Sequence, residues 1–370
     1  MRTMILGLGA AGNKAVILAV ENHVISQDNV ILINSTTTDI PSSYEGLKIE
    51  LPGKIGGTGK DRNISKKQAK HALENNLIDI KGFLFDENDR KKYDQVILVS
   101  STDGGSGSGS TIVFADYIKS KLNVPVFIYA FVGRPKDIRG LRNTVEFFKE
   151  IGNKYTVSII ANEKLAAGAD DTNDSLIESK ANVEFCKSLG LILGNSISHE
   201  DVEQNLDDRE LVKIRTTPGY FISAVKVFDD KIKNVDQVRK EAMDLFDKLP
   251  YPDPDNMDMT RVGLVYNSAK DESSYMDILP VVKEKFGLSF ETFTHRQYKD
   301  EKECPRMFGV LMAGLSMPAK YVADVYAEYA DATKTINKSG DDFNDTVNGM
   351  AFSEDDEVFE TESMDDILGF

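Results

Sequence analysis

The sequence predicts an α/β protein in which a doubly wound parallel sheet is followed by a smaller, mixed α/β domain. From residue 3 to 165 short apolar strands alternate with helical segments, which is typical of a parallel sheet covered by helices on both faces. Glycine-rich turns follow several of these strands, at the sheet edge where such folds bind ligands. Beyond residue 219 strands and helices alternate less strictly, which predicts a mixed sheet.

The first glycine-rich turn lies between a predicted strand at residues 3–9 and a predicted helix at 11–24, and it reads G-x-G-x-x-G from Gly7 onward. This spacing suits a diphosphate bound at a helix N-terminus. A dinucleotide-binding Rossmann domain would place Asp or Glu after the next strand, residues 30–33, but Asn34 stands there. The missing acid argues against an NAD-dependent dehydrogenase, the alternative that this turn supports.

The next glycine-rich segment, residues 53–60, resembles a Walker A loop without matching its pattern. Asp61 follows Lys60, where a Walker A loop has Ser or Thr, and the leading glycine is misplaced. These mismatches argue against a P-loop NTPase. A helix is predicted to follow, with Ser65 as its cap and Ile80 as its end.

The most informative stretch is residues 93–121. Its apolar run from Val96 to Val99 predicts a buried parallel strand, and apolar residues from Ile112 onward recur at helical spacing. Between them stand four glycines and three serines, from residue 104 to 110. A strand that turns through bare backbone N–H groups into a helix N-terminus forms a phosphate cradle. A flexible linker is the alternative, which the flanking strand and helix disfavour.

A further strand is predicted at residues 124–131, and Arg139 and Arg142 then enter a helix that runs through Phe148. These arginines can reach a nucleotide's phosphates or base, or they can be solvated helix charges. The last strand of the first sheet is predicted at residues 155–160.

A long helix is predicted from Ser175 to Leu193, with Gly194 as its stop. After it, Asp207 and Glu210 stand three residues apart and share one helical face, where they can polarise one water or simply form a solvated acidic turn. The remaining predicted elements are strands at 219–228, 260–267, 288–295 and 306–315, and helices at 235–248, 274–286 and 319–336.

The composition is that of an ordinary globular protein, and 370 residues suffice for two domains. The start passes directly into a strand, so no signal peptide is expected, and no apolar run reaches the length of a membrane span. Cys186 and Cys304 lie far apart, which favours a reduced cytosolic protein. The net charge of −16 argues against a broad nucleic-acid surface, so neither direct nucleic-acid binding nor membrane insertion is expected.

Most of the negative charge lies in residues 341–370, which hold eleven Asp and Glu residues and no Lys or Arg. This composition predicts a disordered acidic tail. Its last residues, Met364 to Phe370, include apolar side chains, which suggest either a docking peptide for a partner or a merely solvating end.

Four motifs together resemble the tubulin/FtsZ family, and they fall in the family's order across residues 5–222. Residues 104–109 resemble its signature loop, G-G-[TS]-G-[ST]-G, and residues 7–13 resemble its first nucleotide loop. Residues 159–165 resemble I-P-N-[DE]-K-L, and residues 205–210 resemble the catalytic loop N-x-D-x-x-[DE].

The sequence departs from the family in places: Ala161 replaces a proline, Val202 replaces a glycine, and the third loop at 53–60 matches loosely. The chain length and a long helix at 319–336 before an acidic tail look more like the phage and plasmid tubulins, the TubZ and PhuZ groups, than cell-division FtsZ.

The resemblance implies GTP or GDP bound across the loops, with the guanine against Asn173 and Mg²⁺ assisting. The implied nucleotide contacts are Gly9, Ala10, Ala11, Asn13, Asn34, Gly104, Gly105, Ser106, Gly107, Ser108, Gly109, Arg139, Arg142 and Asn173. It also implies that Asn205, Asp207 and Glu210 complete the site of a neighbouring subunit in a head-to-tail filament. The implied parts are a nucleotide-binding domain at 1–172, a central helix at 173–196, an activation domain at 197–318, a C-terminal helix at 319–340 and the tail.

The resulting hypothesis is a GTP-hydrolysing protein that polymerises in the cytoplasm of a bacterial host and moves plasmid or phage DNA. A division-ring protein, a non-hydrolysing relative and the dehydrogenase remain alternatives. An adaptor or cargo protein is expected at the acidic tail.

Overall fold

The computed structural model describes residues 2–53, 57–134, 137–166, 173–195, 197, 202–256, 258–300 and 302–346, with side chains described up to residue 335. None of the helices within these ranges is long and apolar enough to cross a bilayer.

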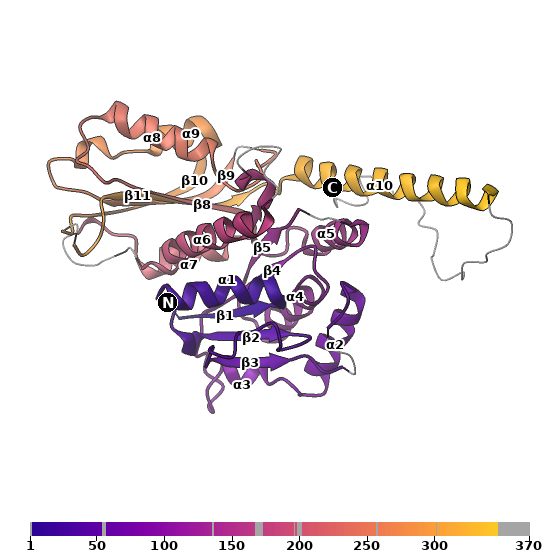
Figure 1. Ribbon diagram of the computed structural model, residues 1–370. Helices are drawn as coiled ribbons and strands as arrows, with labels where there is room; N and C mark the ends of the chain where they lie inside the picture. Colours follow the sequence, from indigo (N-terminus) through magenta and orange to yellow (C-terminus); the bar gives the residue numbers. More distant parts are fainter. Residues whose placement is uncertain are drawn as a thin grey trace.

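The first half of the chain forms parallel strands in the order β3-β2-β1-β4-β5-β6, which confirms the predicted doubly wound arrangement (Figure 1). All of these strands except β3 are almost wholly buried, because helices cover both faces. The strands are β1 (Thr3–Leu8), β2 (Val30–Asn34), β3 (Leu47–Glu50), β4 (Gln95–Ser101), β5 (Val126–Val132) and β6 (Thr156–Ala161).

The second half continues the sheet as β8-β11-β9-β10-β7, with parallel and antiparallel pairs, as the sequence predicts. Two residue pairs, Thr156 with Gly219 and Val157 with Tyr220, join β6 to β8. The strands are β7 (Val202–Gln204), β8 (Gly219–Val227), β9 (Met259–Asn267), β10 (Ser289–Gln297) and β11 (Met307–Leu315).

The helices of the first half cover the sheet, and α1 begins at the residue after β1. They are α1 (Gly9–Glu21), α2 (Arg62–Glu74), α3 (Ile80–Leu84), α4 (Ser106–Asp116) and α5 (Ile138–Ile151), with short turns η1 (Gln27–Asn29), η2 (Tyr117–Lys121) and η3 (Asn162–Leu165). The later helices are α6 (Asp174–Leu193), α7 (Asp208–Thr216), α8 (Val235–Asp247), η4 (Ser273–Tyr275), α9 (Leu279–Phe286) and α10 (Ala319–Thr346).

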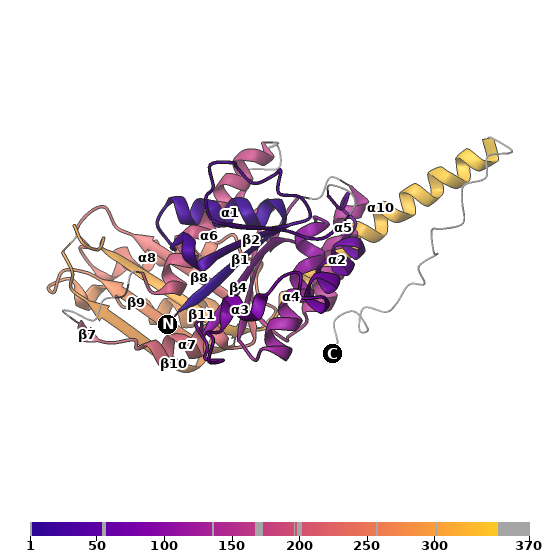
Figure 2. The same ribbon diagram turned by 90° about the horizontal axis from the view of Figure 1, so that it is seen from below.

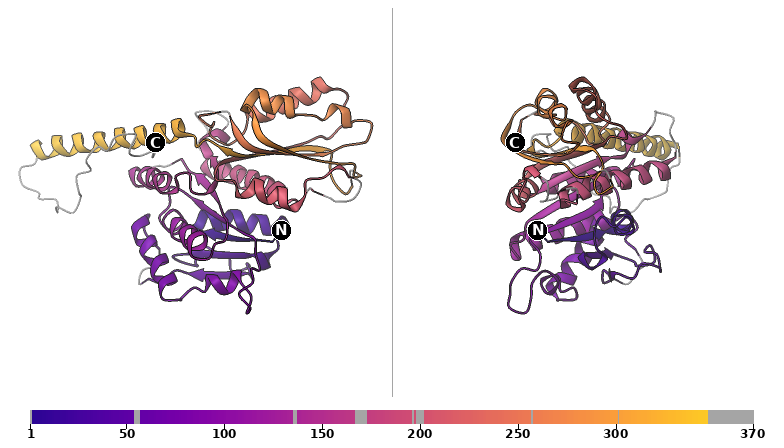
Figure 3. Two further views of the ribbon diagram at one scale, coloured as in Figure 1. Left: turned by 180° about the vertical axis from the view of Figure 1, so that it is seen from behind. Right: turned by 90° about the vertical axis from the view of Figure 1, so that its left-hand side faces the viewer.

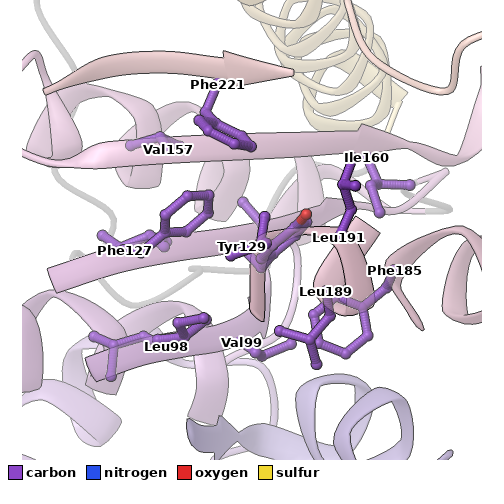
Figure 4. Close-up of a cluster of buried hydrophobic side chains, with 14 of the residues drawn as sticks. Leu98, Val99, Phe127, Tyr129, Val157, Ile160, Phe185, Leu189, Leu191 and Phe221 are labelled. Carbon is purple, nitrogen blue, oxygen red and sulfur yellow. The ribbon is translucent and has the colours of Figure 1, made fainter. Parts of the chain in front are cut away.

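Helix α6 lies between the two halves and contacts α1 on one side and β8 and β11 on the other (Figure 1). Its core contacts include an aromatic cluster in which Tyr129 and Phe185 pack edge to face with ring centroids 5.0 Å apart (Figure 4). Gly194 adopts a left-handed conformation with φ of 78° and ends the helix, as predicted. Both cysteines of the chain, Cys186 and Cys304, are buried and unpaired.

Helix α10 packs against α5 at its start and then projects away from the body (Figure 2), on the side opposite to the second-half sheet (Figure 3). It extends to Thr346, beyond the boundary at 340 that the resemblance implies. The acidic tail from residue 347, including the expected docking peptide, lies outside the described residues.

Two predicted helices begin elsewhere, for identifiable reasons. The helix predicted from Ser65 to Ile80 is instead α2 and α3, and α2 is capped by Asp61, whose Oδ1 accepts hydrogen bonds from Asn63 N and Ile64 N. The helix predicted at 274–286 is a short turn followed by α9, because Pro280 in the first turn sets the start of α9. Strands β3 and β7 are short, partly exposed edge strands that the apolar pattern does not mark.

Candidate functional site

The signature loop and the first glycine loop pack backbone against backbone at the carboxyl edge of the parallel sheet. A Cβ added at Gly9, whose φ is +72°, would lie 2.7 Å from the backbone nitrogen of Gly107. A Cβ added at Gly107 would lie 2.5 Å from the carbonyl oxygen of Leu8. Only glycine fits this contact, so the first turns of α1 and α4 lie side by side. Two adjacent helix N-termini make a strong anion site.

Two further loops meet the signature loop. A Cβ added at Gly105 would lie 2.3 Å from Thr58 Oγ1 and 2.7 Å from the carbonyl carbon of Lys60. The Ser106 hydroxyl is hydrogen-bonded to the Ser35 hydroxyl and lies 3.4 Å from Thr58 Oγ1. The structure therefore brings together the loops after β1, β2, β3 and β4, including Gly9, Ala10, Ala11 and Gly104 to Gly109.

Two buried amides at this edge carry polar atoms that are available to a ligand. Both side-chain polar atoms of Asn13, which is 1% exposed, have no hydrogen-bond partner in the described part of the chain, and neither has Oδ1 of Asn162. Leaving a buried polar group unpaired costs about 1–3 kcal/mol, so such groups commonly mark bound water or ligand. Asn162 lines a cavity of about 170 Å³ that also includes Lys60, Asp103, Gly133, Arg134, Asp174, Ile177 and Glu178.

We call the group of loops after β1, β2, β3 and β4 the cradle, and the other predicted contacts lie around it. Asn34 accepts a hydrogen bond from Ser35 N and donates one to Asp39. Asn173 caps α6 by accepting a hydrogen bond from Leu176 N, and the following Asp174 pairs with Arg134 at 3.8 Å. These bonds place the start of α6 beside the loop after β5.

The two arginines of α5 that were predicted to contact the nucleotide have different partners within the chain. Arg139 donates to the carbonyl oxygen of Gly59 at 3.1 Å and so supports the loop after β3. Arg142 donates to Glu146 on its own helix at 2.8 Å. Both line a separate cavity of about 180 Å³ that adjoins Lys60.

A buried arginine fixes the helix that starts in the signature loop. Arg62, at the start of α2, donates to the Ser108 hydroxyl at 2.9 Å and to Glu150 at 2.8 and 2.9 Å. Burial raises the pKa of Glu150, but hydrogen bonds and charge from Arg62 and Lys66 outweigh it and lower that pKa overall. This ionic contact ties α2 and α5 to α4.

The predicted acid pair belongs to α7, which lies at the amino ends of the parallel strands, opposite to the cradle. Asp207 and Glu210 form a capping box: Asp207 Oδ1 accepts from Glu210 N at 2.8 Å, and Glu210 Oε2 accepts from Asp207 N at 3.1 Å. The same helix, α7, is bound to the amino end of β4, since Gln95 Nε2 donates to the carbonyl oxygen of Arg215 at 3.1 Å.

The acid pair is therefore far from the cradle of its own chain. Strand β4 is seven residues long, from Gln95 to Ser101, and the signature loop follows its carboxyl end, which separates the two ends of the strand by roughly 20 Å. The 20 residues of α6 span about 30 Å between Asn173 and Gly194. Asn205 lies between β7 and α7, two residues before Asp207.

Three residues of the cradle were not predicted as site residues from the sequence. Asn162 belongs to the segment that resembles I-P-N-[DE]-K-L, which is the signal that could have identified it. Lys60 ends the segment that resembles a Walker A loop. Asn143, which is 4% exposed, donates to the carbonyl oxygens of Lys60, Asp103 and Gly104, and no sequence pattern marks it.

No family model and no curated protein matches this sequence. Solved structures do match it. TubZ of the Clostridium botulinum phage c-st, with its C-terminal tail truncated, is 18% identical, with 90% of this chain and 98% of that chain covered and a TM-score of 0.69. CetZ2 of Haloferax volcanii, in a GTPγS-bound protofilament, is 16% identical over 90% of this chain and 100% of that chain, with a TM-score of 0.70.

An FtsZ dimer of M. jannaschii is 17% identical over 85% of this chain and 88% of that chain, with a TM-score of 0.65. The three matches cover 85% to 90% of this chain. They confirm the resemblance in architecture that the four motifs predict: this chain has the fold of the tubulin/FtsZ superfamily.

Proposed function

We propose that this protein is a GTPase that polymerises head to tail into filaments. The observation that carries the proposal is the separation of the glycine cradle and the acid pair, which lie at opposite edges of the sheet in one chain. A second copy stacked in the same orientation brings its acid pair toward the first copy's cradle. Such a heterologous contact does not close on itself and builds a filament.

The cradle fits a nucleotide. The paired N-termini of α1 and α4 supply backbone N–H groups for phosphates, and the unpartnered amide of Asn13 and Oδ1 of Asn162 are placed to hydrogen-bond a polar ligand beside them. We assign the guanine to the start of α6, near Asn173. The GTPγS named for the CetZ2 protofilament supports this choice of nucleotide.

The hydrolytic step needs positioning and charge stabilisation more than covalent chemistry. In the proposed contact Asp207 and Glu210 of one subunit orient and polarise a water toward the terminal phosphate held by the next, and Asn205 helps to place it. The capping box holds both carboxylates at fixed positions, so they arrive pre-organised.

Mg²⁺ fits the donor set of the cradle, and when bound it neutralises charge that develops on the phosphates. It prefers oxygen ligands and usually takes only one or two carboxylates besides the phosphates. Asp39 and Asp103 offer carboxylates at these loops, and Ser106 offers a hydroxyl. The described residues contain no group of three or more His, Cys, Asp or Glu side chains arranged for a metal.

We also propose that the filament works in the cytoplasm of a bacterial host and positions plasmid or phage DNA through an adaptor that binds the acidic tail. The phage origin of the c-st TubZ, 98% of which is covered by the match, supports a link to phage.

The proposal is tested by the dependence of GTP hydrolysis on protein concentration. Because each site needs an acid pair from a neighbour, phosphate release per subunit should rise steeply with concentration, and sedimentable filaments should appear by electron microscopy over the same range. A rate per subunit that stays flat would indicate a monomeric enzyme.

Titration with NADH in place of GTP tests the dehydrogenase alternative, and binding of NADH but not of GTP would favour the dehydrogenase and overturn the proposal.

A further inference from the structure

We propose that His295 is a positioning residue for hydrolysis, because its imidazole holds the segment that leads into the acid pair. The inference rests on the proposed function, since it concerns how Asp207 is placed for the neighbouring subunit. It assigns a role to a buried histidine of β10 that no motif in the sequence marks.

The segment before α7 is attached to the sheet by a short edge strand. Among the described residues, β7 pairs with β10 through two residue pairs, and the register shifts between them. Strand β7 ends at Gln204, three residues before Asp207 caps α7. Sheet pairing therefore stops short of the acid pair, and another contact must fix the course of the segment.

His295 supplies that contact. The backbone N–H of Leu206 donates to His295 Nδ1, with 3.3 Å between the two nitrogens. Both residues are buried, since His295 is 0% and Leu206 1% exposed. A buried backbone N–H needs a partner, because leaving it unpaired is costly. The ring therefore fixes the residue that directly precedes Asp207.

The direction of this hydrogen bond determines the tautomer of the imidazole. A backbone N–H can only donate, so Nδ1 accepts, and the proton of the neutral ring lies on Nε2. Nε2 then donates to Gln297 Oε1 at 3.0 Å, and Gln297 Nε2 donates to Cys304 Sγ at 3.4 Å. This buried chain of hydrogen bonds holds His295 in the tautomer that presents an acceptor to Leu206.

The contact lies far from the cradle of its own chain, so it separates hydrolysis from nucleotide binding. In the proposed filament the acid pair acts on the nucleotide of the neighbouring subunit, whereas each chain binds its own nucleotide at the opposite ends of the strands. Misplacing a reacting group by about 1 Å can cost roughly 100-fold in rate. Loss of the Nδ1 acceptor should therefore lower turnover and leave the affinity for GTP unchanged.

The test uses two polar substitutions in the full-length protein that place an acceptor differently. His295→Asn puts its amide oxygen at the position of Nδ1, whereas His295→Gln puts its amide near the position of Nε2. His71→Gln, at an exposed position of α2, is the matched control. Phosphate release per polymerised subunit should fall by roughly 10- to 100-fold in His295→Gln and stay within about threefold of the unmodified protein in the other two variants. Titration calorimetry should give the same GTP affinity for all of them.

Thermal midpoints separate positioning from folding. Since His295→Asn removes more of the ring, it should destabilise the fold at least as much as His295→Gln does. A purely structural role would therefore make His295→Asn the less active variant, the reverse of our expectation. The inference is overturned if His295→Gln hydrolyses GTP normally, or if His295→Asn loses as much turnover as His295→Gln.

A measurement on the unmodified protein keeps the inference testable if a variant fails to fold. Two-bond ¹H–¹⁵N correlation spectra, with His295 assigned by elimination among the four histidines of the chain, should show a neutral ring protonated at Nε2. A ring protonated at Nδ1 cannot accept from Leu206 and would overturn the inference. If the unmodified protein shows no GTP turnover that depends on its concentration, the proposed function fails together with the inference, whereas such turnover with an unaffected His295→Gln refutes the inference alone.

Discussion

At the scale of single residues, Asp207 and Glu210 have a structural role and a proposed catalytic role, and a test must change one without the other. In the isolated chain they cap α7, and in the proposed filament they activate water. An alanine substitution would remove both roles at once, and the loss of the Asp cap alone would lower the free energy of unfolding by about 1 kcal/mol. Asn and Gln keep the capping hydrogen bonds and remove only the charge.

Asp207→Asn and Glu210→Gln should therefore fold and assemble with GTP but hydrolyse it slowly. We expect a loss of roughly 100-fold in phosphate release per polymerised subunit, the scale of a lost general base. Sedimentation with GTP and the thermal midpoint should remain those of the unmodified protein. Asp208→Asn, one residue along the same turn, is the control, and normal turnover in the Asp207 variant would refute the catalytic role.

At the scale of elements, α4 depends on α2 and α5 for its position. Arg62 joins all three helices through Ser108 and Glu150, and its side chain is 1% exposed. The helix that carries the signature loop therefore rests on an ionic contact rather than on apolar packing alone.

Arg62→Met should lower the free energy of unfolding by about 2–3 kcal/mol, because charged hydrogen bonds are lost from a buried position. Arg90→Met, which breaks an exposed pair with Asp86, should have a much smaller effect in the same denaturant titration. Equal costs for the two variants would contradict the structural role of Arg62.

The pH dependence of the same contact has a definite sign. The pKa of Glu150 is lowered in the folded state, so its contribution is complete above the ordinary carboxyl pKa and is lost as the pH falls through the folded value. Stability of the unmodified protein should therefore fall more steeply below about pH 4.5 than that of Glu150→Gln.

The sequence predicted the strands of the first sheet well, because continuous apolar runs such as Val96 to Val99 leave little choice for a buried parallel strand. It predicted helix starts less well. The signature glycines mark a turn by composition, yet residues from Ser106 onward already form α4. Glycines whose role is contact with another loop, such as Gly107 against Leu8, carry no local signal that separates them from flexible ones.

The site was predictable only where a motif covers it. Asn143 and Lys60 act through contacts between segments some 80 positions apart in the chain, and no spacing within either segment reveals them. The partner loops of the cradle come together because parallel strands end at one edge, a property of the whole sheet.

At the scale of the whole molecule, the sheet runs through both halves, but only two residue pairs join β6 to β8. Helix α6 crosses this junction and contacts α1 in the first half and β8 and β11 in the second. The two edges that meet in the proposed filament are thus connected inside each subunit by one long helix.

The two buried cysteines have a practical consequence for spectroscopy. Burial raises the pKa of the Cys186 thiol to about 11 and also raises that of Cys304, so both should resist thiol reagents at pH 8 while the protein is folded. We expect dithionitrobenzoate to titrate two thiols per chain in guanidinium and almost none in buffer, whereas rapid native labelling would contradict the burial. A dye attached to one cysteine introduced on α10 would then report subunit exchange without removal of either natural thiol.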